Sequence, residues 1–305
     1  MSLTPDPATA GATDIGTASP AAVGARPSDA RVATKERLAL LRRSKSFIAG
    51  SIIVGFFVLC AIFGELVVKD PLASDPINDL ASPSADHWFG TDKLGRDVFA
   101  RVITGARDVL IVAPLATILG TVVGTTLGLV TGYFRGWVDD VLSRIIEAFL
   151  ALPAIIMALL VIVAVGPSKI AMIVVIGGLF APIISRTVRA AVLTERELEY
   201  VSAARLRNER TPYILFGEIL PNVTAPIVVE FTVRLGYAIF LAASLSFLGF
   251  GIQPPAPDWG VQVAEHYGLI SGGFWWPVIF PAVAIAVLII GVNLIADGVA
   301  SVFER

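Results

Sequence analysis

The sequence predicts an all-α membrane protein with about six transmembrane helices. Hydrophobic residues make up 55% of the 305 residues and charged residues only 16%, with a mean hydropathy of +0.79. That composition is too apolar for a soluble domain. The charges are also clustered, which leaves several windows long enough to cross a hydrocarbon core of ~30 Å. A net charge of -2 gives no basic field, so nucleic acid is not an expected partner.

The first part of the chain, residues 1–46, is rich in Ala, Pro, Ser, Thr and Gly. It offers too little apolar surface to offset the entropy of ordering, so we expect a disordered cytoplasmic tail. A signal peptide is the competing interpretation. The polar stretch is too long for one, and the apolar run that follows is nearer a full span. The tail ends in a basic cluster formed by Lys35, Arg37, Arg42, Arg43 and Lys45.

Six apolar runs predict the spans, at residues 47–68, 109–133, 141–165, 170–192, 223–251 and 274–296. The first span and the loop after it form one unit, 47–108, and the remaining five spans form a core, 109–305. In the second span glycine recurs every four residues, a spacing that lets another helix approach the backbone. Packing within the chain is the preferred interpretation, and a subunit interface is the alternative. These glycines are Gly120, Gly124, Gly128 and Gly132.

The distribution of lysine and arginine predicts the orientation. If the N-terminus is inside, most of these residues fall in inner segments, and this bias favours two cytoplasmic termini. The loop at 194–222 is then also cytoplasmic, and His87 and His266 lie outside. The outer segments hold only Lys69, Lys93, Arg96, Arg101, Arg107 and Lys169.

The loop at 194–222 is the longest charged interruption in the apolar second half of the chain. Thr194 and Glu197 have the spacing of a capping box, which predicts the start of a short helix. Asn208 favours the left-handed conformation that ends a helix. The loop is either a solvated connector or a docking element, in which the small residues Ala203 and Ala204 let a partner approach the backbone.

A second short helix is expected in the same loop. Thr211 before Pro212 is its start signal, a capping hydroxyl followed by a proline in the first turn. Pro221 is expected to close the unit.

Elsewhere the sequence offers few chemical sites. The glycines of FGTDKLGRD have the spacing of a phosphate-binding loop, but Arg96 and Asp97 replace the required Lys-Ser/Thr pair, so a structural turn is expected before an amphipathic segment. Cys60 is the only cysteine, and neither histidine has a metal-ligand spacing. We therefore expect no cofactor, no metal and no catalytic residue.

Two charges interrupt the fifth span. Glu230 and Arg234 are one helical turn apart, where charges are costly in lipid. Mutual neutralisation and contact with a transported substrate explain the pair about equally well, so it is a candidate part of a translocation path.

Four strings carry a family resemblance: FGTDKLGRDVFARVITGAR (Phe89–Arg107), EYVSAARLRNERTPYILFGEILPN (Glu199–Asn222), SLSFLGFGIQPPAPDWG (Ser244–Gly260) and WWPVIFPAVAIAVLIIGVNLIADG (Trp275–Gly298). With the six-span layout they resemble the C-type inner-membrane permease subunit of bacterial dipeptide, oligopeptide and nickel ABC importers. The resemblance implies a type I ABC-importer permease fold, with one N-terminal helix and a five-helix core. It also implies the bacterial plasma (inner) membrane, a second permease subunit, two cytoplasmic ATPase subunits and an external solute-binding protein.

The resemblance identifies the loop at 194–222 as the coupling loop that fits a groove in an ATPase. The family motif reads Glu-Ala-Ala, then Gly, and later His-x-Leu-Pro. This chain departs at three positions, where Ser202 replaces Glu, Asn208 replaces Gly and Glu218 replaces His. The coupling residues implied are Tyr200, Ser202, Ala203, Ala204, Arg205, Asn208, Glu218, Leu220 and Pro221.

Three functions compete. The first is a non-catalytic permease subunit for peptides or similar small solutes, with nickel or another small solute as the alternative cargo. A self-contained secondary transporter would need its own ion relay, and the spans offer few acids for one. An intramembrane enzyme would need a nucleophile–base or metal-ligand spacing that the sequence does not show.

Overall fold

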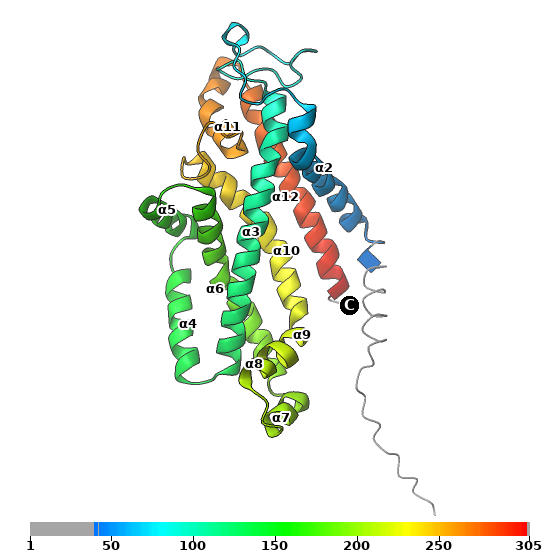
Figure 1. Cartoon of the computed structure of the whole chain (residues 1–305), viewed down its shortest axis with the longest axis vertical. Coiled ribbons are helices and arrows are strands. Elements are labelled where there is room, and N and C mark those ends of the chain that lie inside the picture. The colour runs from blue at the N-terminus through cyan, green and yellow to red at the C-terminus, as the bar shows by residue number, and fades with distance from the viewer. Residues whose placement is uncertain (1–39, 42, 304–305) are drawn as a thin grey trace, which may run out of the picture. The chain divides into compact units, whose positions relative to one another are not determined.

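The computed structural model describes residues 40–41 and 43–303 (Figure 1). Most of the expected tail at 1–46, with Arg42, and the terminal Arg305 lie outside these residues. Within the described part the regular elements are helices, apart from an isolated antiparallel bridge between Thr91 and Asp97. The expected all-α class is confirmed.

Among the residues that the structure describes, five helices are long and apolar enough to cross a membrane. They are α2 (Lys45–Val67), α3 (Val98–Tyr133), α6 (Lys169–Glu195), α10 (Thr224–Phe247) and α12 (Trp276–Phe303). The amphipathic segment and the second span form one 36-residue helix, because the Asp97 carboxylate caps α3 by accepting the Ala100 N–H at 2.9 Å. The boundary expected between the first unit, 47–108, and the five-span core, 109–305, therefore falls inside a helix.

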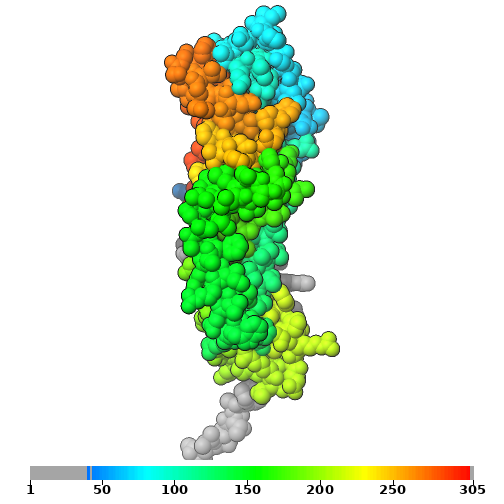
Figure 2. All heavy atoms as spheres, turned by 90° about the vertical axis from the view of Figure 1, so that its left-hand side faces the viewer, coloured from blue at the N-terminus to red at the C-terminus, as the bar shows by residue number. Residues whose placement is uncertain are grey.

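The third expected span, 141–165, is not a straight helix. The chain forms α4 (Trp137–Leu150) and α5 (Ala154–Val165), whose axes meet at 92°. Pro153 precedes α5 and has no N–H to continue the hydrogen-bond pattern of α4. The bent pair counts as a sixth span or as a re-entrant loop. Figure 2 shows α4 and α5 covering one face, with the 199–222 segment below them.

Helices α3 and α6 pack backbone to backbone along the glycine stripe. A Cβ added at Gly120 would lie 2.8 Å from the Gly177 carbonyl oxygen, and one at Gly128 would lie 2.6 Å from the Val188 Cβ. Only glycine permits so close an approach between two helices. The preferred interpretation of the stripe as packing within the chain is confirmed.

The fifth span is shorter than expected. Helix α10 ends at Phe247 and not near 251, because Gly249 takes a left-handed φ of +83°. The N–H groups of Gly249 and Phe250 donate back to the carbonyls of Ser246 and Leu245, which closes the helix. The sixth span is longer than expected, since α12 runs on to Phe303.

Short helices gather at one end of the bundle, uppermost in Figure 1: η1 (Pro76–Asn78), α11 (Trp259–His266) and η3 (Tyr267–Gly272). Trp259 is fully buried there, and its Nε1–H donates to the Val102 carbonyl of α3 at 2.8 Å. The opposite end carries α7 (Glu199–Leu206), α8 (Thr211–Tyr213), η2 (Ile214–Ile219) and α9 (Leu220–Asn222).

Candidate functional site

The segment joining α6 to α10 is folded and packed, not an open connector. Helix α7 turns its Val201 and Ala204 side chains inward, and both are fully buried. They pack with the one-turn π-helix η2, whose Ile214 and Ile219 are also buried. The chain's own hydrophobic core therefore holds α7 in place.

The burial of Ala204 corrects one expectation. We expected Ala203 and Ala204 to form a small face that receives a partner. Ala204 is covered by this chain, so it is small because η2 lies against it. The exposed face of α7 carries Ser202, Arg205 and Leu206 instead, and Leu206 is 84% exposed.

The expected capping box is also absent. Thr194 lies inside α6, and its hydroxyl donates to the Ala190 carbonyl. Helix α6 continues past Thr194 because Arg196 fastens its end to α3 by donating to the Gly132 and Tyr133 carbonyls. Glu197 pairs with Arg135 at 2.8 Å, and α7 begins after Leu198 without a side-chain cap.

The C-terminus of α7 follows the prediction. Asn208 has φ of +55°, and its N–H donates to the Arg205 carbonyl at 3.0 Å. The next N–H, that of Glu209, donates to the Ala204 carbonyl at 3.2 Å. These two bonds form a Schellman motif, in which asparagine serves as the left-handed residue usually supplied by glycine.

The second half of the loop differs from the prediction in two ways. Thr211 lies inside α8 and caps nothing, because the helix begins after Arg210. Pro221 does not close the unit, since the chain stays helical through Asn222 and resumes as α10 at Thr224. Because Pro221 has no N–H, the helical hydrogen-bond pattern is interrupted there, next to the π-helical turn η2.

Polar side chains stabilise the loop from within. The Tyr200 hydroxyl donates to Glu195 Oε2 at 2.8 Å, and burial, followed by this carboxylate, raises the pKa of Tyr200 to about 12. Arg207 Nε lies 2.7 Å from Glu209, and its Nη2 lies 3.7 Å from Glu218. Glu218 therefore acts as an internal partner of Arg207.

The charge pair of the fifth span is largely satisfied inside the chain. Arg234 Nε lies 3.0 Å from Glu230 Oε2, and Thr187 donates its hydroxyl to the other Glu230 oxygen at 2.8 Å. The guanidinium also lies over the Tyr237 ring, 5.5 Å from its centre. The two charges therefore neutralise each other inside the span.

A buried ion cluster at the opposite end was not anticipated. Asp92 accepts hydrogen bonds from Arg96 Nε at 2.7 Å and Arg101 Nη1 at 2.6 Å, and it is fully buried. Arg96 also reaches Glu265 at 3.1 Å, and the Nδ1–H of His266 donates to the Gln262 carbonyl at 2.7 Å. In spite of its desolvation, the backbone N–H of Leu94 and the arginines hold the pKa of Asp92 below its usual value.

The sequence carried a weak signal for this cluster. The FGTDKLGRD turn needs left-handed glycines, and Gly90 and Gly95 have φ of +74° and +70°. A Cβ at Gly95 would meet the Asp75 carbonyl oxygen at 1.9 Å. The expected structural turn is confirmed. His87, one of the two residues expected outside, lies at this end with its Nδ1 2.8 Å from Asp97.

Two family models match the chain. Residues 124–305 match the binding-protein-dependent transport system inner membrane component, and residues 35–83 match the N-terminal transmembrane domain of oligopeptide transport permease C. The chain is 40% identical over 265 residues to the dipeptide transport system permease protein DppC of Alkalihalophilus pseudofirmus, covering 87% of each chain. It is 35% identical over 280 residues to the glutathione transport system permease protein GsiD of Escherichia coli, covering 90% of each.

One solved structure shows the same fold. It is a chain of the MetNI methionine ABC transporter in inward-facing conformations, with a TM-score of 0.55 at 22% identity. The match covers 67% of this chain and 97% of that one. The extent of the family match and the identity to the curated relatives decide the assignment: the chain belongs to the binding-protein-dependent transport system inner membrane components, as a C-type permease subunit of an ABC importer.

Proposed function

We propose that this permease forms half of the translocation path for peptides or similar small solutes. The import is driven by ATP hydrolysis in two ATPase subunits, together with a second permease and an external solute-binding protein. The named relatives support the cargo, since one serves a dipeptide system and another a glutathione system. Nickel or another small solute is the alternative cargo. Uptake profiling of a deletion strain, with and without a complementing copy of this gene, tests the cargo. If the strain without the gene still imports every peptide tested, the peptide cargo is wrong.

The observation that carries the coupling role is the exposed face of α7. Leu206 is 84% exposed, and the nearby Tyr213 and Phe216 are 54% and 50% exposed. Large apolar side chains on an otherwise charged segment mark an interaction surface. The ATPase docks there, on Ser202, Arg205 and Leu206, while Val201 and Ala204 hold α7 to the permease.

Leu206→Asp tests this surface. A carboxylate in the centre of an apolar contact is desolvated without a partner, so ATPase co-purification should fall at least tenfold. Membrane abundance should not change, because the described part of the chain leaves most of the Leu206 side chain exposed. Ile77→Asp is the matched control, since Ile77 is 91% exposed at the opposite end. Normal co-purification of the ATPase with Leu206→Asp would show that α7 is not the docking site.

Two further variants refine the surface. Ser202→Glu restores the family acid on the exposed face and should be tolerated or strengthen ATPase contact. Ala204→Asp buries a carboxylate in the permease itself and should lower its abundance, because unpaired burial costs several kcal/mol. Equal abundance of Ala204→Asp and wild type would contradict the inward packing of α7.

The pair Glu230 and Arg234 is a candidate part of the translocation path. Both side chains stay 17–18% exposed inside a span, and the adjacent Tyr237 is 57% exposed. The double variant Glu230→Gln/Arg234→Gln separates the two roles, because it removes both charges together and leaves none unpaired. Reduced uptake at normal abundance supports a place in the path. Normal uptake by the double variant shows that the charges only neutralise each other.

The proposed orientation has both termini in the cytoplasm and the 69–97 loop outside, as the lysine and arginine distribution favours. Single cysteines at positions 87 and 207, in a Cys60→Ala background, can be treated with an impermeant thiol reagent in intact cells. Labelling is expected at 87 only. Labelling at 207 only would show that the topology is the reverse of the proposed one.

The permease contributes no nucleotide chemistry of its own, because its sequence has no phosphate-cradling loop. The purified subunit should neither bind nor hydrolyse ATP. Saturable ATP binding, with contaminating ATPases excluded, would show that the permease has a nucleotide site of its own. Uptake that continues without any ATPase subunit would favour a self-contained secondary transporter.

A further inference from the structure

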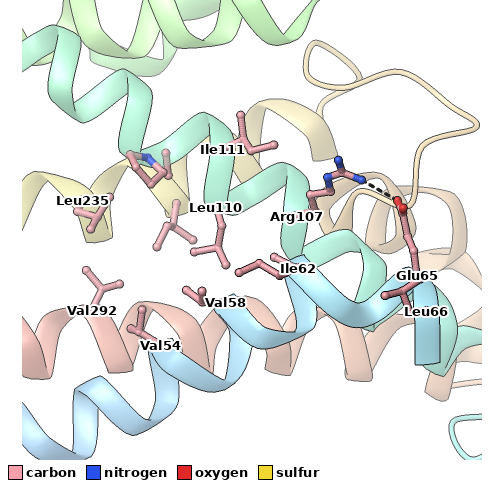
Figure 3. Close-up of a pocket in the computed structure, with 14 residues that line it drawn as sticks. Val54, Val58, Ile62, Glu65, Leu66, Arg107, Leu110, Ile111, Leu235 and Val292 are labelled. Atoms are coloured by element: carbon pink, nitrogen blue, oxygen red, sulfur yellow. Dashed lines mark hydrogen bonds and ion pairs between the residues drawn. The ribbon is translucent and has the colours of Figure 1, made fainter. Parts of the chain in front are cut away.

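A lateral groove lies beside the second half of α2, between this helix and its neighbours in the bundle. It has a volume of about 730 Å³ and is bounded by α2, α3, α10 and α12. Figure 3 shows side chains from these helices around it, including Val54, Val58, Leu235 and Val292. Its lining is apolar except for Glu65 and Arg107. The groove is therefore a hydrocarbon-lined site at the depth of the membrane spans.

The groove is open at the side. Of its α2 residues, Val58 is 38% exposed, Ile62 is 62% exposed and Leu66 is 82% exposed. Helix α2 packs against α12 and α3, yet only 17% of its most apolar window is buried. In a bilayer the surroundings of such a groove are acyl chains, which are as apolar as the side chains that line it.

One end of the groove is charged. Arg107 Nη1 lies 2.9 Å from Glu65 Oε1, and both side chains are more than half exposed. Glu65 stands in the last turn of α2, which ends at Val67, so the pair lies where the apolar span stops. Figure 3 shows this pair at one end of the row of apolar side chains.

A second cavity continues from that end. It measures about 680 Å³ and shares Glu65, Arg107 and Ile111 with the groove. Its lining carries further charges at Asp70, Asp108 and Lys169. The two cavities together present an apolar chamber of span depth joined to a chamber with charges of both signs.

We propose that the joined cavities bind one bilayer phospholipid with a zwitterionic, primary-amine headgroup, that is, a phosphatidylethanolamine. An acyl chain lies in the groove between α2 and α3. Each cavity lies within the ~300–1,000 Å³ typical of small-molecule sites. The bound lipid fills the space that the direct contacts of α2 with α3 and α12 leave open.

The charges select the headgroup. Among the described residues Arg107 donates only to Glu65, through Nη1, which leaves the rest of its planar fork for a phosphate. Glu65 and Asp70 offer carboxylates to the ammonium. The phosphatidylglycerol headgroup offers hydroxyls but no cation to these carboxylates, and the quaternary ammonium of phosphatidylcholine cannot donate a hydrogen bond to them.

Native mass spectrometry of the assembled, delipidated transporter tests the headgroup. Phosphatidylethanolamine is titrated against phosphatidylcholine and phosphatidylglycerol of the same acyl chains. Wild type should hold one phosphatidylethanolamine, Arg107→Gln should bind it at least tenfold more weakly, and Glu65→Gln should lose the preference over phosphatidylcholine. Arg135→Gln is the matched control, because the Arg135–Glu197 pair has nearly the same distance, 2.8 Å, and exposure. Equal weakening by Arg107→Gln and Arg135→Gln would overturn the proposal.

A second pair of variants tests the groove itself. Val58→Trp fills it and should abolish retention of the lipid at unchanged abundance. Leu59→Trp places the same bulk on a residue that is 57% exposed and does not line the groove, so the lipid should stay. Two results contradict the assignment. One is full retention of the lipid by Val58→Trp. The other is that the isolated permease binds the lipid but the assembled transporter does not, which would show that another subunit covers the groove.

Discussion

Replacing Gly124 by alanine tests the seam between α3 and α6. The new Cβ would lie 2.7 Å from the Ala181 carbonyl oxygen and 2.8 Å from the Ile184 Cβ. Non-bonded carbon atoms prefer ~3.5–4.0 Å, so the two helices must separate by several tenths of an ångström or more. Neither contact is the end of a flexible side chain. Overpacking of this kind costs about 1–3 kcal/mol.

The matched control is Gly178→Ala, on the α6 side. Gly178 has no atom within 4 Å of an added Cβ, so this alanine should gain up to ~1 kcal/mol from helix propensity alone. Both variants receive the same propensity gain, and the difference between them isolates the clash.

The assay is unfolding of the purified permease in mixed micelles by titration with SDS, followed by tryptophan fluorescence. We expect Gly124→Ala to be less stable than Gly178→Ala by about 1–3 kcal/mol. A difference below about 0.5 kcal/mol, the size of an ordinary surface effect, would refute the argument that the seam depends on missing side chains.

Three other predictions use the same unfolding assay. Asp92→Asn leaves the fully buried Arg101 without its closest carboxylate and should cost about 3–5 kcal/mol, whereas Glu147→Gln in an exposed pair should be neutral. Burial raises the pKa of Asp258 from 3.8 to about 6, so the folded state holds the extra proton between these values and stability should fall as pH rises from about 4 to 6. Asp258→Asn keeps the cap of α11, should remove that slope, and should be more stable than wild type at pH 7.5 by roughly 1–3 kcal/mol. Asn208→Val should destabilise the loop, because a β-branched residue resists the left-handed φ of +55°, while Asn208→Gly should be neutral or stabilising.

The span count could be predicted because hydropathy is a local property. The bend between α4 and α5 could not, since 141–165 is apolar on both sides of Pro153 and hydropathy does not report direction. The end of α7 was predictable because the left-handed preference of Asn208 comes from its own short polar side chain and needs no distant partner.

The errors at the loop share another cause. Thr194 and Glu197 have the right spacing for a capping box, but α6 continues because Arg196 bonds to the end of α3, 63 residues away in the chain. The burial of Ala204 depends on η2 in the same way. The cluster around Asp92 includes Glu265, whose sequence distance to Arg96 is 169 residues. Pairings at that separation have no local signature.

Helix α3 touches both ends of the permease. At 36 residues it is ~54 Å long, and it holds Trp259 near one end and Arg196 at the other. The glycine seam lets the backbone of α3 pack directly against α6. A displacement at α7 should therefore reach the other end, near α11, through α3, which can tilt as a whole or bend at Pro114, where the helix lacks one backbone hydrogen bond.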